Sequence, residues 1–208
     1  EVTAWSFHPR KVLTTGEGGM LTTTRAECAE RARRLLEHGM TISAAERHRS
    51  VLPPREGYGE IGFNHRMTDL QAALGVVQVG RLPEIVRRRR EIAATYTKAL
   101  GEVPGLRPVR DPGHGTTNFQ SYWVEVGPGY PLGREQLLAR LAEAEISARR
   151  GIMAIHRQPA YRGRQVRPGP LPVTERLSET TLILPVFHHL SESDQARVIE
   201  VLVRCGRP

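Results

Sequence analysis

The spacing of hydrophobic and polar residues at the start of the chain predicts two short strands. Residues 2–7 are rich in β-branched and aromatic side chains, as strands usually are. A polar loop through Pro9 and Lys11 follows, then a glycine-rich turn at 14–19, and residues 20–23 can resume a strand. We therefore expect two strands joined by a loop that carries a lysine.

A helix and a long loop are predicted next. Thr24 and Glu27 have the spacing of a capping box, and the apolar residues after them keep a helical period up to a stop at Gly39. Residues 41–61 contain several prolines and glycines and show little periodicity. We interpret them as a long loop, a kind of segment that is often functional in a compact domain.

Two more helices are predicted before residue 101. Thr68 and Gln71 form a second capping-box pattern at the start of one of them. Pro83 suits the first turn of the other, which extends over 82–100, because a proline there lacks only an amide that has no helical partner.

For the rest of the chain we expect a compact α+β domain. We place the domain boundary within the helix at 82–100, so that residues 1–85 form one domain and 86–208 the other. The expected elements are strands at 119–126 and 181–187, a helix around Leu137, Leu138 and Leu141, and a last helix capped by Ser191 and Asp194 that ends near Gly206.

The net charge of +8 comes almost wholly from arginine, and lysine occurs only at Lys11 and Lys98. The arginine run 87–90 lies in a predicted helix, where successive residues are rotated by about 100° and cannot form one basic stripe. We expect a solvated helix, with Arg89 near the apolar face and its charged end in water. A protein that binds nucleic acid is thus a less favoured alternative.

The sequence gives little support for a metal site or a membrane-spanning segment. Cys28 and Cys205 stand alone in helix-like stretches, outside any zinc-ligand spacing, so we interpret both as small buried residues and expect no metal. No apolar run reaches the roughly 20 residues of a membrane span. The expectation is a cytoplasmic protein without a membrane partner.

The loop around Lys11 has the residue types of a catalytic site. A lysine amine can be tuned to act as a nucleophile, whereas arginine stays protonated. The glycines at 16 and 18 lack the third glycine of a dinucleotide site, and no Gly-Lys-Ser/Thr sequence ends the loop. A solvated surface lysine beside a structural turn is the ordinary alternative.

These stretches together resemble the DegT/DnrJ/EryC1/StrS family of sugar aminotransferases. The lysine block and the block around Asn64 are the specific matches, and the others support them in family order. The matching stretches are 6–11, 15–19, 62–69, 71–75, 88–90 with Tyr96, 149–153 with His156, 159–161, and 184–187 before Ser191.

The resemblance implies an α/β fold, namely a fold-type I transferase that uses pyridoxal 5′-phosphate (PLP), with part of the large domain followed by a small α+β domain. It also implies a homodimer with shared active sites. Lys11 would carry PLP and move a proton during the reaction, and Ser6 would bind the cofactor phosphate. Asn64 would reach the phosphate in the neighbouring subunit, while His8 would pack near the cofactor or fix the loop.

The implied reaction moves an amino group, with L-glutamate as the expected donor, to a keto-sugar bound to a nucleotide. The implied substrate-binding residues, each of which has an ordinary ion-pair or surface role as an alternative, are Arg66, Arg149, Arg150, His156 and Tyr161. A related branch of sugar dehydratases has histidine in place of the lysine, and Lys11 argues against it. A catalytically inactive or regulatory relative is another alternative.

In relatives, several cofactor-binding residues precede the lysine by a longer stretch than this chain has. We therefore expect the 208 residues alone to bind PLP poorly and to be inactive. The activity expected here is that of a complete protein.

Overall fold

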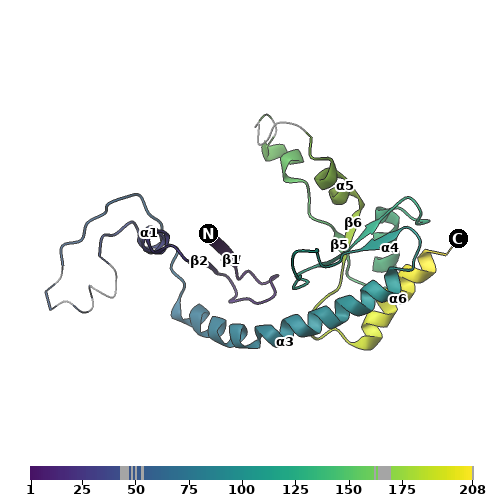
Figure 1. Ribbon diagram of the computed structural model, residues 1–208, viewed down its shortest axis with the longest axis horizontal. Helices are drawn as coiled ribbons and strands as arrows, with labels where there is room; N and C mark the ends of the chain where they lie inside the picture. Colours follow the sequence, from purple (N-terminus) through teal and green to yellow (C-terminus); the bar gives the residue numbers. More distant parts are fainter. Residues whose placement is uncertain are drawn as a thin grey trace. The chain divides into compact units, whose positions relative to one another are not determined.

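The computed structural model describes residues 1–42, 47, 49, 51–52, 54–161, 163 and 170–207 (Figure 1). The chain forms two compact units, Glu1–Leu82 and Pro83–Pro208, and the division between them falls within one helix. The predicted boundary between residues 85 and 86 refers to the two domains of a complete enzyme, and it stays a prediction.

The first unit begins with the two expected strands. β1 (Val2–Ser6) pairs antiparallel with β2 (Gly19–Thr23), in a register that places Val2 opposite Thr23 and Ser6 opposite Gly19. Across the pair the indole nitrogen of Trp5 donates to Thr22 Oγ1 at 2.9 Å. The two strand predictions are confirmed, and the Lys11 loop joins the paired strand ends.

Helix α1 (Ala26–Leu36) begins differently from the prediction. The N-cap position is Arg25, and its side chain makes no hydrogen bond to the first turn. The predicted capping box of Thr24 and Glu27 is therefore wrong. Glu27 instead accepts from the Arg25 guanidinium at 2.6 Å. The helix ends before Gly39, which has φ +73° and no room for a Cβ, since one would lie 2.0 Å from the Glu60 carbonyl oxygen.

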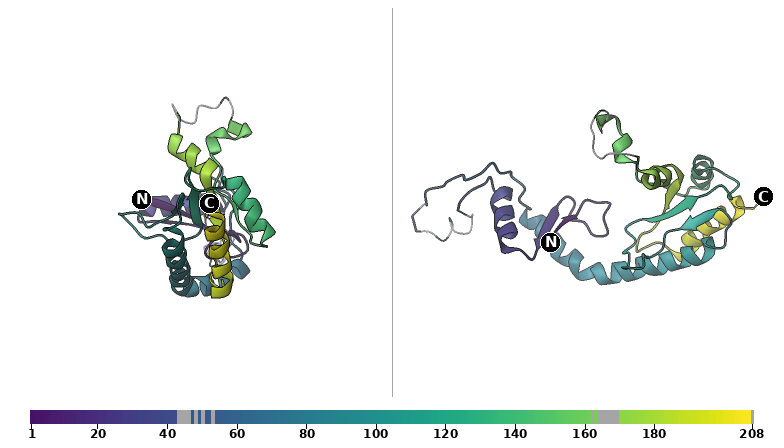
Figure 2. Two further views of the ribbon diagram at one scale, coloured as in Figure 1. Left: turned by 90° about the vertical axis from the view of Figure 1, so that its right-hand side faces the viewer. Right: turned by 45° about the horizontal axis from the view of Figure 1, so that its top comes forward.

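Helix α3 (Asp69–Leu100) is a single element where two helices were predicted (Figure 2). The expected capping box at its start is confirmed: Gln71 Oε1 accepts from the Thr68 amide at 3.0 Å, and Thr68 Oγ1 accepts from the Gln71 amide at 3.3 Å. Pro83 lies inside the helix, where it removes one hydrogen bond. The packed face that follows, with Ile92 and Tyr96 fully buried, offsets that loss.

The second unit is built on a four-stranded antiparallel sheet with the order β3-β4-β6-β5. Its strands are β3 (Leu106–Pro108), β4 (Tyr122–Val126), β5 (Arg149–Arg150) and β6 (Thr181–Leu184). The two very short strands, β3 and β5, were not predicted. The strand expected at 119–126 starts only at Tyr122 because Phe119 has φ +46°, and the one expected at 181–187 ends at Leu184.

Helices complete this unit. They are α4 (Arg134–Glu143), the 3₁₀ turns η1 (Ile155–Arg157) and η2 (Pro159–Tyr161), α5 (Pro172–Thr180) and α6 (Glu192–Cys205). The predictions of α4 and α6 are confirmed, and Ser191 caps α6 by accepting from the Asp194 amide at 3.0 Å. Helix α5 and the two 3₁₀ turns were not predicted.

The core of the second unit lies between the sheet and residues of α3, α4 and α6. Tyr96, Tyr122, Leu137 and Leu202 are fully buried there. Burial of each large apolar side chain contributes about 1.5–3 kcal/mol, so this core accounts for the fold of the unit.

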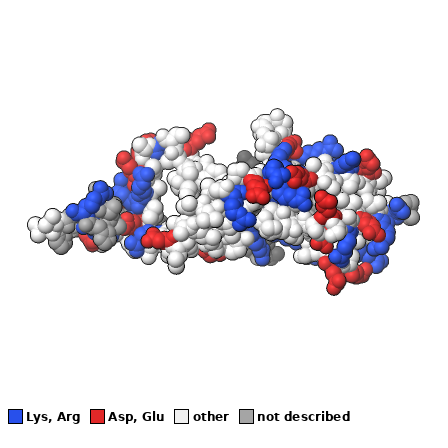
Figure 3. Space-filling view, turned by 90° about the horizontal axis from the view of Figure 1, so that it is seen from below, with Lys and Arg blue, Asp and Glu red and all other residues white. Residues whose placement is uncertain are grey.

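One residue of the arginine run 87–90, Arg89, is buried beside this core. Arg89 is only 7% exposed and donates through Nη1 to the Phe119 carbonyl at 2.8 Å, so the expectation that its charged end reaches water is wrong. Burial lowers the pKa of Arg89. Arg90 binds Asp111 at 2.8 Å, and Arg87 and Arg88 pair with Glu91. On the face shown in Figure 3, acidic residues are interspersed among the basic ones.

Candidate active site

The loop between β1 and β2 is closed by backbone hydrogen bonds at its base. The Phe7 amide donates to the Gly18 carbonyl at 2.8 Å, and the Phe7 carbonyl accepts from the Thr15 amide at 3.1 Å. The same carbonyl accepts from Thr14 Oγ1 at 2.8 Å. The segment 8–13 therefore projects from a fixed base.

Within this loop, the turn at 8–11 is held by His8. The His8 carbonyl accepts from the Lys11 amide at 2.9 Å, and His8 Nδ1 accepts from the Arg10 amide at 3.1 Å. His8 Nε2 lies 3.9 Å from Glu17 Oε1 across the loop. The turn thus fixes the backbone of Lys11 relative to the paired strands.

Lys11 itself lies on the exposed surface of this loop. Its side chain is exposed and has no hydrogen-bond or ion-pair partner among the described residues. Ser6, at the end of β1, is also exposed and lies opposite Gly19. The structure therefore places Ser6, His8 and Lys11 on one loop and its supporting strand.

The glycine-rich turn after Lys11 is packed more tightly than its composition reveals. Thr15 is 4% exposed, and its hydroxyl donates to the Glu17 carbonyl at 2.8 Å. A Cβ at Gly18 would lie 2.5 Å from that Thr15 oxygen, so only glycine fits. Gln71 Nε2 donates to the same Glu17 carbonyl at 3.0 Å, a support that the sequence analysis missed.

Asn64 and Arg66 lie next to each other and share an acidic neighbour. Asn64 Oδ1 accepts from Arg66 Nε at 3.2 Å, and Arg66 Nη1 lies 3.7 Å from Glu37 Oε1. Glu37 also forms an isolated backbone bridge with Asn64. Both predicted residues remain exposed, and Glu37 was not identified from the sequence.

In the second unit, Arg149 and Arg150 are exposed neighbours on β5. Adjacent residues of a strand point to opposite faces, so the two guanidinium groups separate. Arg150 Nε donates to Glu135 Oε1 at 3.0 Å. This pairing lowers the pKa of Glu135 and raises the pKa of Arg150. Arg150 is thus an ion-pair residue in this structure, the ordinary alternative for its position.

His156 belongs to a small ionic network on η1 and α5. Its Nε2 lies 3.0 Å from Glu175 Oε1, while Arg157 Nη2 donates to Glu175 Oε2 at 2.6 Å. The hydrogen bond with His156, followed by one from the Leu171 amide, lowers the pKa of Glu175. His156 Nδ1 is buried without a partner among the described residues. Tyr161, half-buried, ends the neighbouring turn η2.

An apolar hollow of about 310 Å³ adjoins the segment that follows β5. Ile152 and Met153 line it together with Trp123, Leu177 and Ile183 of the sheet and α5. Gly151 approaches β6 so closely that a Cβ would lie 1.9 Å from Thr181 Oγ1. None of the five predicted substrate-binding residues lines this hollow, although Arg149 and Arg150 directly precede the 151–153 segment in sequence.

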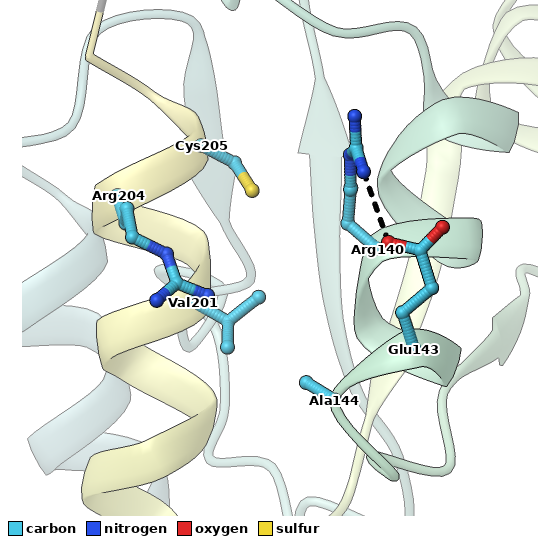
Figure 4. A pocket seen from close by; sticks show the side chains of 6 residues that line it. All are labelled: Arg140, Glu143, Ala144, Val201, Arg204 and Cys205. Carbon is cyan, nitrogen blue, oxygen red and sulfur yellow. Dashed lines mark hydrogen bonds and ion pairs between the residues drawn. The ribbon is translucent and has the colours of Figure 1, made fainter.

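A second hollow, of about 320 Å³, opens between α4 and α6 (Figure 4). It is lined by Arg140, Ala144, Val201, Arg204 and Cys205, and Arg140 donates to Glu143 at 3.0 Å. No predicted site residue lines it.

The cysteines are free, and the described side chains form no metal-binding group. Cys28 and Cys205 are both free and only partly buried, and Cys205 packs against the core of the second unit, so the expectation that both are buried is wrong. In the part of the chain that the structure describes, His, Cys, Asp and Glu form no group of three or more placed to hold a metal ion. No described helix is long and apolar enough to cross a membrane.

Comparisons with known proteins agree in pointing to sugar aminotransferases. The chain is 33% identical over 209 residues to dTDP-4-dehydro-2,3,6-trideoxy-D-glucose 4-aminotransferase of Saccharopolyspora spinosa, covering 96% of this chain and 51% of that one. It is 34% identical to UDP-4-amino-4-deoxy-L-arabinose–oxoglutarate aminotransferase of Shewanella sediminis, covering 95% and 53%.

A solved structure extends the likeness to the fold. The aminotransferase TlmJ of Streptoalloteichus hindustanus superposes with a TM-score of 0.83 at 35% identity, over 99% of this chain and 52% of that one. The chain thus has part of the fold-type I architecture of PLP-dependent aminotransferases, and it spans about half the length of the relatives it matches. The model of the DegT/DnrJ/EryC1/StrS aminotransferase family matches residues 1–203, and the chain belongs to this family.

Proposed function

We propose that the complete protein is a PLP-dependent aminotransferase that moves an amino group from L-glutamate to a keto-sugar carried by a nucleotide. The observation that carries this proposal is Lys11, an exposed amine without a described partner on a turn fixed to a strand pair. Family membership and the two sugar-nucleotide aminotransferases among the relatives support it. We also propose that the protein works in the cytoplasm.

The residues of the first unit suit the proposed cofactor chemically. Lys11 offers the amine that an aldehyde requires, and the Ser6 hydroxyl can donate a hydrogen bond to a phosphate oxygen. The Asn64 side-chain amide can also donate a hydrogen bond to a phosphate. We assign it to the phosphate of the cofactor in the neighbouring subunit of a homodimer. Gly18 and the buried Thr15 keep the turn close to the strands, so that the lysine has a firm base.

PLP, when bound, supplies an electron sink for the electrons of the donor's Cα–H bond, and the protein supplies position and proton transfer. Lys11 Nζ holds the cofactor before the reaction. Once the amino donor has replaced it, the free Nζ would be the base that takes the proton from the donor's α carbon and later gives it up. A lysine is suited to this because it can lose its proton, which arginine cannot do.

For the substrates we assign recognition of anionic groups to the arginines. Arg66 has the planar donor fork that binds a carboxylate, and its contact with Glu37 at 3.7 Å is loose enough to exchange. Arg149, His156 and Tyr161 are assigned to the nucleotide-sugar. Arg150 joins them only if the substrate replaces Glu135 as its partner.

The test uses the complete protein loaded with PLP. Addition of L-glutamate should change the visible absorbance of the bound cofactor and release 2-oxoglutarate. Lys11→Arg keeps the charge but should abolish both signals. Lys98→Arg changes the other lysine of this chain, which lies in α3, and should leave both signals as in the wild type. Equal signals in Lys11→Arg and the wild type would refute the proposal.

A further inference from the structure

His8 binds both amide groups that lead up to the proposed catalytic lysine. Its carbonyl accepts from the Lys11 amide at 2.9 Å, and its ring atom Nδ1 accepts from the Arg10 amide at 3.1 Å. Pro9, between His8 and Arg10, has a fixed φ and no amide to donate. One residue therefore determines the path of the backbone over the whole turn before Lys11.

The contact with the Arg10 amide requires an acceptor at Nδ1 of the ring. Nδ1 can accept a hydrogen bond from the Arg10 amide only in a ring whose Nδ1 carries no proton. Glu17 Oε1 lies 3.9 Å from His8 Nε2. The charged group that faces the ring is therefore Glu17 across the loop, while the charged residues Arg10 and Lys11 belong to the same turn.

We propose that His8 is a positioning residue whose neutral ring holds the turn that presents Lys11, and that protonation of the ring releases this turn. This inference rests on the proposed function, because it concerns the reactivity of Lys11 toward PLP. In the protonated ring both nitrogens are donors, so Nδ1–H would face the Arg10 N–H and the hydrogen bond would be lost. The ability of Lys11 to take up the cofactor then falls on the acid side.

Two substitutions separate the acceptor from the titrating group. In His8→Asn the side-chain oxygen can accept from the amide two residues on, as in an Asx turn, and it does not titrate. In His8→Phe a ring of similar size remains, but the acceptor is gone. Arg10→Ala is the matched control, because it removes a neighbouring charge and keeps the backbone amide that His8 binds.

The first measurement is the initial rate at which the complete protein attaches PLP to Lys11, trapped with borohydride from about pH 5 to about pH 8, the range in which histidines titrate. The ratio of the wild-type rate to the His8→Asn rate should fall by up to about tenfold toward the acid end of this range. A tenfold change corresponds to the free energy of about one hydrogen bond. His8→Phe should be slow relative to His8→Asn throughout, and Arg10→Ala should follow the wild type.

The second measurement needs no cofactor: hydrogen exchange of the Arg10 amide in the same proteins. That amide should be protected at neutral pH in the wild type and in His8→Asn, and should exchange faster in His8→Phe. The inference is overturned if His8→Phe equals the wild type in both measurements, or if the rates of the wild type and His8→Asn have the same dependence on pH. Absence of label on Lys11 in the wild type overturns the proposed function, whereas the amide exchange still decides whether His8 holds the turn.

Discussion

The side-chain amide of Gln71 donates to the carbonyl oxygen of Glu17 at 3.0 Å and so ties the first turn of α3 to the glycine-rich turn after Lys11. The other end of the same amide accepts from Thr68 and caps the helix. One side chain thus links a helix start to the loop that carries the proposed catalytic lysine.

Gln71→Ala should therefore destabilise the complete protein by about 1–2 kcal/mol, since it removes a cap and a loop contact together. Urea denaturation, followed by circular dichroism, measures the change in free energy of unfolding. Gln78→Ala is the matched control within α3, because the Gln78 side chain makes no hydrogen bond among the described residues. Equal effects of the two substitutions would contradict the assigned role of Gln71.

Gly18→Ala should distort the turn after Lys11, because its Cβ would lie 2.5 Å from the buried Thr15 hydroxyl. We expect a loss of about 1–3 kcal/mol of stability, as in other overpacked sites, together with slower attachment of PLP. Gly113→Ala adds the same methyl group where no atom lies within 4 Å, and it should be neutral. If the Gly18→Ala and Gly113→Ala proteins were equally stable, the turn could accommodate a Cβ at position 18 and the prediction would be wrong.

Alkaline pH should destabilise the core of the second unit. Burial raises the pKa of Tyr122 from 10.0 to about 12, and burial also raises the pKa of Tyr96, whose ring centroid lies 5.0 Å away. The unfolded chain loses these protons near pH 10, so stability is fully present below that pH and is lost as pH rises toward about 12. Each pH unit in this window costs up to about 1.4 kcal/mol per buried tyrosine.

The measurement is the free energy of unfolding between pH 9 and the onset of alkaline unfolding, in the range set by these pKa values. Tyr122→Phe should flatten the dependence, whereas Tyr58→Phe, at a tyrosine 63% exposed, should not. A steep dependence that survives in Tyr122→Phe would assign the effect to other groups.

Glu175→Gln should disturb the segment assigned to the nucleotide-sugar. It weakens the contacts of one carboxylate with both His156 and Arg157, at 3.0 and 2.6 Å. We expect a rise in KM for the keto-sugar substrate of up to about tenfold, the worth of one hydrogen bond, with the L-glutamate half-reaction unchanged. Glu179→Gln is the control, because Glu179 pairs with Arg157 but not with His156. If both variants raised KM by the same factor, the contact of Glu175 with His156 would not be the cause of the weaker binding of the keto-sugar.

The elements set by local sequence were predictable. The strands beside Lys11, the Thr68 capping box and the Ser191 cap depend on residues within a few positions of one another. Pro83 was misjudged because its local preference for a first turn is overridden by the packed face of α3 beyond it. Strands β3 and β5 are too short to leave a periodic signal.

The site was predictable only in part. Lys11 could be identified because its neighbours form a dense, specific block, but the acidic partners could not. Glu175 lies 19 residues from His156, and nothing in either stretch indicates that the chain brings them together. The same holds for Glu37 and Arg66, whose contact depends on the path of the intervening loop.

The most direct test of the central claim is the position of the covalent cofactor. Borohydride reduction of the complete, PLP-loaded protein, followed by proteolysis and peptide mass spectrometry, should place the pyridoxyl group on Lys11 in stoichiometric amount and leave Lys98 unmodified. A pyridoxyl group on any other residue, or on none, would contradict the account.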